Sequence, residues 1–178
     1  MHKILVPLAE GFEEIEAITI VDVLRRAGMK VITAGIPGSI IVGSHNVRVT
    51  TDKKIDDISP DEYDAVILPG GYPGYVNMGK TQKVISMVTS FSQENKLIGA
   101  ICAAPTILAK IGLLEERKAT VYPGMEKEIP YPRGDKVVVD GNIVTSQGPG
   151  TAIPFSLKII EILEGKDKAK AVKKELVF

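Results

Sequence analysis

The sequence predicts an α/β protein, a flavodoxin-like three-layer α/β/α sandwich with a mostly parallel sheet and added β-hairpins. Short apolar runs alternate with longer amphipathic stretches along the 178 residues, as β-strands and α-helices do in such folds. Turn-forming segments such as Pro69–Gly71 and Gly148–Gly150 follow apolar runs. Parallel strands joined by helices are covered on both faces, which produces the three layers.

The first half of the chain begins with a strand at Lys3–Leu8, which leads into the loop sequence AEGF. A helix is expected from Glu13 to Ala27, because Gly28 is well suited to end it. The remaining predicted elements of this half are strands at Met29–Ala34 and Tyr63–Leu68, and a hairpin of Ile40–Val42 and Val47–Thr50 around Gly43-Ser44-His45-Asn46.

The second half continues the alternation and closes with helices. The run Lys96–Ile101 predicts a buried strand, and Ile107, Leu108 and Ile111 then lie on one face of a helix. The other expected elements are a helix at Lys80–Gln93, a strand at Ala119–Val121, a hairpin of Lys136–Asp140 and Asn142–Ser146 around Asp140-Gly141, a helix from the loop Gln147–Thr151 to Leu163, and a basic helix at Lys166–Glu175.

Composition indicates one globular domain over residues 1–178, with 44% hydrophobic and 25% charged residues. Lysine plus arginine and aspartate plus glutamate both number 22, so the balanced charge argues against a protein that mainly binds nucleic acid. We expect no membrane span, and the start MHKILVPLAEGFEE does not resemble a signal peptide. A single cysteine cannot form an internal disulfide, which fits a cytoplasmic location.

Cys102, the only cysteine, lies between a predicted strand and a predicted helix. That turn belongs to the carboxyl edge of the sheet, where α/β folds place ligands. A helix N-terminus there favours a thiolate with a lowered pKa. The alternative is a small buried side chain, the usual fate of a free cysteine.

Glu16 shares a helical face with four apolar residues: Ile20, Val23, Leu24 and Ala27. Two interpretations stay open. As an ordinary acidic residue of a first helical turn, Glu16 lies at the rim and complements the helix dipole. If it is buried instead, desolvation raises its pKa, and its protonated carboxyl can donate a hydrogen bond to a nearby thiolate.

Gly70 and Gly71 follow a strand, and their backbone N–H groups are candidates for holding an oxyanion, although α/β turns need glycine in any case. The segment from Gly74 to Thr81 matches the phosphate-loop pattern G-x-x-x-x-G-K-T. Five residues separate it from the strand and several of its own residues are bulky, so we interpret the match as accidental.

Neither of the two histidines, His2 and His45, can be linked to Cys102 from the sequence alone. His2 lies at the terminus and His45 in a hairpin turn. No cluster of cysteine and histidine has the spacing of a metal site, so we predict no metal.

The ordered motifs GFEEIE, VDVLRRAG, VILPGG, AICAAP and TSQGPGT resemble the ThiJ/PfpI superfamily, a class I glutamine amidotransferase-like group. Within it, the chain is most similar to the subgroup of the parkinsonism-associated deglycase DJ-1 and bacterial YajL. The resemblance implies that Cys102 is a reactive cysteine in a strained elbow and that Glu16 donates a hydrogen bond to it. It also implies that Gly71 and Ala103, with Gly70 in the same loop, supply an oxyanion site.

The resemblance further implies a homodimer, in which the first helix with Arg25 and Arg26 contributes to the interface, and no cofactor. The sequence departs from the family at Tyr122, where many members carry histidine. Members of the protease type also have histidine at the position of Ala103. Both differences weaken a peptidase interpretation.

The leading functional hypothesis is therefore a cofactor-independent glyoxalase III or deglycase that uses Cys102 on reactive carbonyls such as methylglyoxal, in stress protection. The alternative is a redox-responsive stress protein or chaperone in which Cys102 is oxidised. An intracellular cysteine peptidase is the weaker alternative.

Overall fold

A seven-stranded sheet forms the centre of the computed structural model, which describes residues 1–178. Its strands are β1 (Lys3–Ala9), β2 (Lys30–Ile36), β5 (Lys53–Lys54), β6 (Ala65–Leu68), β7 (Leu97–Ile101), β10 (Val137–Asp140) and β11 (Ile143–Ser146). They lie in the order β10-β11-β7-β6-β1-β2-β5, and only the β10–β11 pair is antiparallel. The predicted mostly parallel sheet is confirmed.

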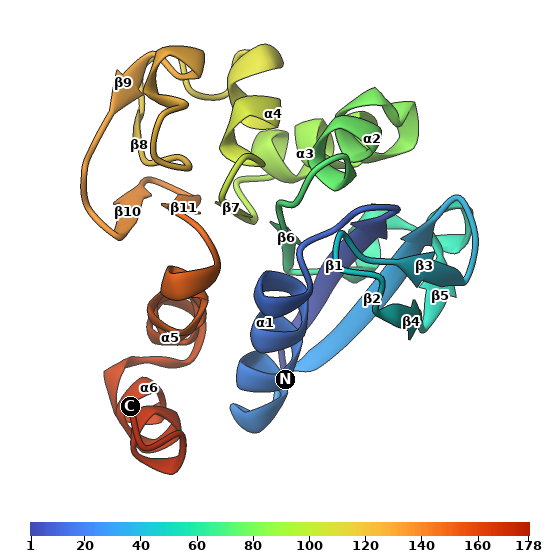
Figure 1. Cartoon of the computed structure of the whole chain (residues 1–178). Coiled ribbons are helices and arrows are strands. Elements are labelled where there is room, and N and C mark those ends of the chain that lie inside the picture. Colours follow the sequence, from blue (N-terminus) through green and yellow to red (C-terminus); the bar gives the residue numbers. More distant parts are fainter.

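Helices cover both faces of this sheet (Figure 1). One apolar core contains residues of α1 (Glu14–Arg26) and α5 (Ala152–Glu164), and α6 (Lys166–Glu175) packs outside α5. The second core contains residues of α2 (Gly74–Lys80), α3 (Gln82–Gln93) and α4 (Pro105–Lys110). In β1, Ile4 and Val6 face the first core and Leu5 faces the second, as the alternation of a strand requires. The α/β/α sandwich is thus confirmed.

The apolar stripe of α1 is buried as expected, with Ile20 and Leu24 both 0% exposed, and Glu16, for which the sequence leaves two interpretations open, is 0% exposed as well. The helix starts where the Glu13 carboxylate accepts a hydrogen bond from the Ile15 N–H at 3.2 Å. Its last residue is Arg26, and Gly28, two residues further on, has a φ of +85°, in the left-handed region that favours glycine. The apolar spacing and the two termini therefore explain both the position and the orientation of α1.

The prediction of one helix over Lys80–Gln93 is wrong in its first turn. Thr81 is extended, with φ −85° and ψ 104°, and it separates α2 from α3. The sequence interpretation overlooked α2, which occupies Gly74–Lys80. Because this segment is helical, its backbone N–H groups cannot form a phosphate-binding loop, which agrees with an accidental motif match.

Two small sheets complete the fold. The predicted hairpin is present as β3 (Ile40–Val42) and β4 (Arg48–Thr50). The strand predicted at Ala119–Val121 is displaced: β8 (Lys118–Ala119) pairs with the unexpected β9 (Tyr131–Pro132). The strand stops at Ala119 because the next N–H, that of Thr120, donates to the Thr145 hydroxyl at 2.9 Å and is not available for pairing with a strand.

Two further differences concern short elements. The sequence analysis did not anticipate β5, and α4 ends at Lys110, so that Ile111 caps the helix instead of extending it. The hairpin around Asp140-Gly141 is confirmed as β10–β11. Four 3-10 helices occupy Ile55–Asp57, Pro60–Glu62, Glu126–Glu128 and Pro149–Thr151. None of the helices combines the length and apolarity that crossing a membrane requires.

Candidate active site

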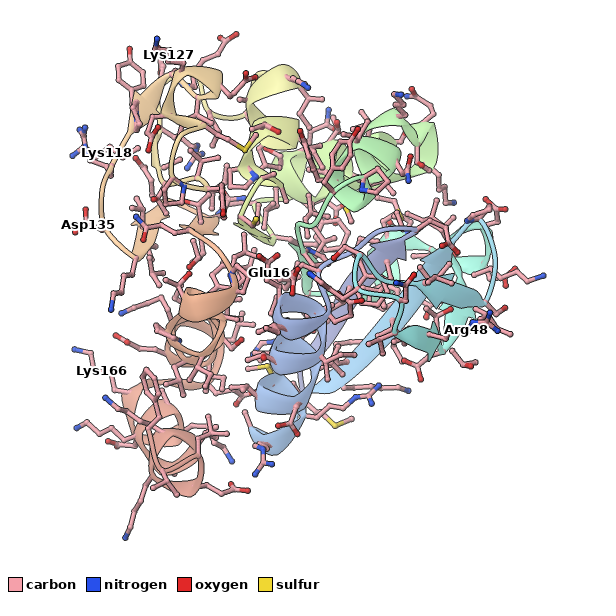
Figure 2. All side chains as sticks on the ribbon, in the orientation of Figure 1. Glu16, Arg48, Lys118, Lys127, Asp135 and Lys166 are labelled. Carbon is pink, nitrogen blue, oxygen red and sulfur yellow. The ribbon has the colours of Figure 1, made fainter.

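The predicted site residues meet at the carboxyl edge of the sheet. Strands β6 and β7 are neighbours, with Leu68 opposite Ala100, so the turns after them lie side by side. These turns carry Gly70 and Gly71 on one side and Cys102 on the other. Glu16 approaches from the first turn of α1, near the middle of the molecule (Figure 2). The fold therefore brings together residues that lie far apart in the sequence.

Cys102 occupies a strained backbone conformation. Its φ is +65°, a region that costs a non-glycine residue on the order of 1–2 kcal/mol. Two hydrogen bonds hold the turn: the Cys102 N–H donates to the Ser146 carbonyl at 3.0 Å, and the Tyr122 N–H donates to the Cys102 carbonyl at 2.8 Å. The side chain is half-buried and lines a cavity. An ordinary core cysteine needs none of these features, which favours the functional interpretation.

Glu16 is fully buried, which decides between its two interpretations. One oxygen, Oε2, accepts a hydrogen bond from the Gly70 N–H at 2.7 Å, whereas Oε1 is buried without a hydrogen-bond partner. Burial raises the pKa of Glu16 to about 7. Gly70 lies so close that an added Cβ would stand 2.6 Å from the Cys102 Cβ and 3.0 Å from Oε2. Only glycine allows this approach.

The two side chains interact, and each affects the ionisation of the other. Burial, followed by the negative charge of Glu16, raises the pKa of the Cys102 thiol to about 12. The backbone N–H groups of Gly71 and Ala103 act in the opposite direction. The thiol pKa lowered by a helix N-terminus is therefore a wrong prediction for this structure, because α4 begins only at Pro105 and burial dominates. When the pair holds a single proton, the sulfur is a thiolate only if that proton lies on Glu16.

An open cavity of about 480 Å³ lies above this pair. Cys102, Glu16, Gly71 and Ala103 line it, and Tyr72, Tyr75 and Met125 add an aromatic and apolar wall. Tyr122 also lines the cavity and is 47% exposed, and its hydroxyl makes no hydrogen bond. Tyr122 thus belongs to the rim and leaves the opening accessible.

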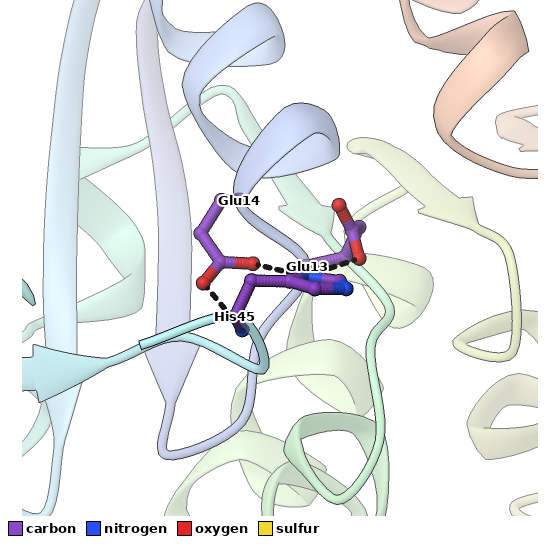
Figure 3. Close-up of side chains that lie close together, drawn as sticks. All are labelled: Glu13, Glu14 and His45. Carbon is purple, nitrogen blue, oxygen red and sulfur yellow. Dashed lines mark hydrogen bonds and ion pairs between the residues drawn. The ribbon is translucent and has the colours of Figure 1, made fainter. Parts of the chain in front are cut away.

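The sequence analysis missed a second polar cluster at the mouth of this cavity. His45, at the tip of the β3–β4 hairpin, lines the same cavity as Cys102. Its Nδ1 lies 3.0 Å from Oε2 of Glu14 and 3.5 Å from Oε2 of Glu13. Figure 3 shows the three side chains together. The Ser44 N–H donates to the Phe12 carbonyl at 2.8 Å, which anchors the hairpin beside α1. The polar hairpin tip was visible in the sequence, but its position over α1 was not.

Glu13, Glu14 and His45 also bring potential metal-ligand atoms within 4.8 Å of one another. Oε1 of Glu14 accepts hydrogen bonds from the backbone N–H groups of His45 and Val47, at 2.7 and 3.3 Å. The imidazole contacts the other oxygen. Because these partners satisfy the carboxylate without an ion, we interpret the group as a hydrogen-bonded cluster.

The fold and the site define an α/β sandwich protein with a cysteine on a strand-to-helix elbow beside a buried glutamate. Comparison with known proteins identifies the family of this protein. The family model described as the DJ-1/PfpI family matches residues 2–162. The chain belongs to the DJ-1/PfpI family.

Curated relatives and solved structures agree with this placement. The chain is 44% identical to protein dj-1beta of Drosophila melanogaster, over 97% of this chain and 95% of that protein. It is 37% identical to the glutathione-independent glyoxalase DJR-1.2 of Caenorhabditis elegans, over 97% of this chain and 94% of that protein. The oxidised DJ-1 structure of Toxoplasma gondii superimposes with a TM-score of 0.97 at 39% identity, over 100% of this chain and 99% of that one.

Proposed function

We propose that the protein is a cofactor-independent glyoxalase III or deglycase-type enzyme that converts reactive carbonyls such as methylglyoxal to hydroxy acids in the cytoplasm. Membership of a family with a glyoxalase-named relative supports an enzymatic role. The observation that carries the proposal is the pairing of Cys102 with a buried Glu16, whose pKa burial raises to about 7, at an open cavity that both residues line.

In the proposed reaction, the Cys102 thiolate adds to the aldehyde carbon of methylglyoxal, and a C–S bond forms as the C=O π bond breaks. The backbone N–H groups of Gly71 and Ala103 hold the resulting oxyanion, which takes a proton to complete a hemithioacetal. Glu16 then removes the proton from C1 and returns it to C2. This transfer yields a lactoyl thioester. Water cleaves that thioester to lactate and restores the thiol.

The direct test is lactate formation from methylglyoxal by the purified protein without added glutathione. We expect lactate in an amount equal to the methylglyoxal consumed, because the scheme adds only one water. A heat-unfolded sample of equal concentration serves as the control, since scavenging by lysine and arginine side chains removes methylglyoxal without making lactate. Consumption of methylglyoxal without lactate would contradict the proposed function.

A redox-responsive role is the second candidate, because the Toxoplasma gondii neighbour at TM-score 0.97 is an oxidised DJ-1. Each equivalent of hydrogen peroxide would transfer one oxygen to the Cys102 sulfur and leave water, and two equivalents produce the sulfinic acid. Glu16 would donate a hydrogen bond to that group. Intact mass after peroxide treatment distinguishes the roles: a rapid gain of two oxygens without carbonyl turnover favours the sensor.

We further propose that the protein is a homodimer whose interface includes α1. Two isoleucines on this helix are exposed to solvent in the single chain, Ile15 at 59% and Ile18 at 44%. We expect Ile18→Lys to convert a dimer to a monomer in analytical ultracentrifugation. Val139→Lys, at a site equally exposed on β10, should leave the dimer intact. A wild-type protein that sediments as a monomer would refute the dimer.

A further inference from the structure

His45 reaches the Cys102 cavity from the β3–β4 hairpin, apart from the strand ends that carry Gly71 and Cys102 and from the helix that carries Glu16. Its backbone N–H donates to Oε1 of Glu14 at 2.7 Å, and its ring Nδ1 lies 3.0 Å from Oε2 of the same carboxylate. The ring Nε2 makes no hydrogen bond with the protein. One nitrogen is therefore fixed by Glu14, while the other is free for a ligand.

This arrangement determines how the ring can handle protons. A carboxylate that accepts from Nδ1–H leaves Nε2 as an acceptor in the neutral ring and as a donor in the charged ring. Hydrogen bonding by Glu14 and the charges of both glutamates raise the pKa of His45. Both effects favour the charged form of the ring, in which Nε2 carries a proton that it can donate. The titratable groups that contact His45 are Glu13 and Glu14, and the others that line its cavity are Glu16, Cys102, Tyr72, Tyr75 and Tyr122.

The ring also occupies a different depth of the cavity from the thiol. The His45 side chain is 73% exposed, whereas Glu16 is fully buried and Cys102 is half-buried. A dicarbonyl compound bound through C1 to the Cys102 sulfur would extend its second oxygen toward the mouth. Ala103 and Ala104, the turn residues that follow Cys102, carry no ionisable side chain that could donate a proton to that oxygen.

We propose that His45, positioned by Glu14, is the proton donor to the outer carbonyl oxygen of a 1,2-dicarbonyl substrate. The proposal rests on the proposed glyoxalase function and gives His45, on the hairpin, a proton-transfer role in that reaction. The enzyme then favours substrates with two adjacent carbonyl groups over simple aldehydes, because only the former place an oxygen at Nε2.

The proton balance of this step is complete. As Glu16 takes the C1 proton, the C1–H electron pair forms the C=C bond of an enediol, and the C2 oxygen accepts the proton of Nε2. Glu16 next returns its proton to C2, and the C1 hydroxyl loses its proton to water as the thioester carbonyl forms. The exposed ring of His45 regains a proton from solvent. No oxidant or cofactor takes part.

The test compares lactate formation from methylglyoxal by wild type, His45→Ala and His2→Gln. His2, the only other histidine, bonds to the Leu163 carbonyl and is absent from the cavity lining, so it is the matched control. We expect His45→Ala to lower kcat at least about 10²-fold with little change in KM, and His2→Gln to behave as wild type. Added imidazole should restore much of the lost rate, because the ring site is open to solvent.

A purely structural role for His45 would not give rescue by imidazole. The alkylation rate of Cys102 by iodoacetamide should stay within a few-fold of wild type, since the thiol itself is untouched. Equal kcat in wild type and His45→Ala would overturn the assignment while leaving the glyoxalase function intact. Loss of rate without imidazole rescue would also overturn it. A wild type that makes no lactate would refute the proposed function and this assignment with it.

Discussion

Cys102→Ser is expected to lower lactate formation from methylglyoxal by on the order of 10³-fold or more. A serine hydroxyl has almost the same size as the thiol, so the strained turn and the cavity should persist. Its pKa lies far above that of any cysteine, and Glu16 cannot generate the alkoxide near neutral pH. The chain has no other cysteine to take its place. The measurement is kcat/KM from a lactate assay at pH 7.5.

Two controls make this result interpretable. Thermal unfolding of Cys102→Ser should lie within a few degrees of wild type, because one sulfur at a half-buried position is replaced by one oxygen. Activity above a tenth of wild type would contradict a covalent role for Cys102. It would leave the backbone N–H groups, Glu16 and His45 to account for catalysis without a covalent step.

Glu16→Gln is expected to remove a pH-dependent loss of stability of about 3 kcal/mol. The pKa of the folded carboxyl is about 7, against an ordinary value of 4.5, and this difference corresponds to that free energy. Below pH 4.5 the group is protonated in both states. As pH rises toward 7 the unfolded chain loses its proton first, so the free energy of unfolding falls. Glutamine has the same shape and does not titrate.

Urea unfolding of both proteins at pH 4.5 and pH 8 measures this effect. The stability of wild type relative to Glu16→Gln should fall by about 3 kcal/mol between these pH values. His45 titrates alike in both proteins and cancels. Glu126→Gln is the matched control: a hydrogen bond from the Gly124 N–H lowers the pKa of Glu126, so its contribution is lost only as pH falls below the ordinary value of 4.5, and Glu126 has no histidine partner. A constant difference between wild type and Glu16→Gln would refute the raised pKa of Glu16.

The Glu16→Gln substitution should also lower the pKa of the Cys102 thiol. Removal of the negative charge takes away one of the causes that raise it, whereas the N–H groups of Gly71 and Ala103 remain. The rate of Cys102 alkylation against pH reports this value directly. Turnover should nevertheless fall, because glutamine cannot carry the C1 proton.

Much of the architecture could be predicted from the sequence, because local patterns govern it. The continuous apolar run of β1 indicates burial on both faces, and the structure divides its residues between two cores. The spacing of Glu16 with Ile20 and Leu24 identified the buried face of α1. Errors occurred where a pattern is short. The break at Thr81 and the two-residue strands β5, β8 and β9 have no periodic signal.

The sequence by itself determined the sheet, the main helices and the residues of the cysteine turn, since each depends on neighbours along the chain. Only the tertiary structure decided that Glu16 is buried, that burial raises the pKa of Cys102, and that His45 enters the cavity. Desolvation and charge depend on distances through space. His45 lies 31 residues from Glu14 in the sequence and beside it in the fold, held there by hydrogen bonds that no local pattern encodes.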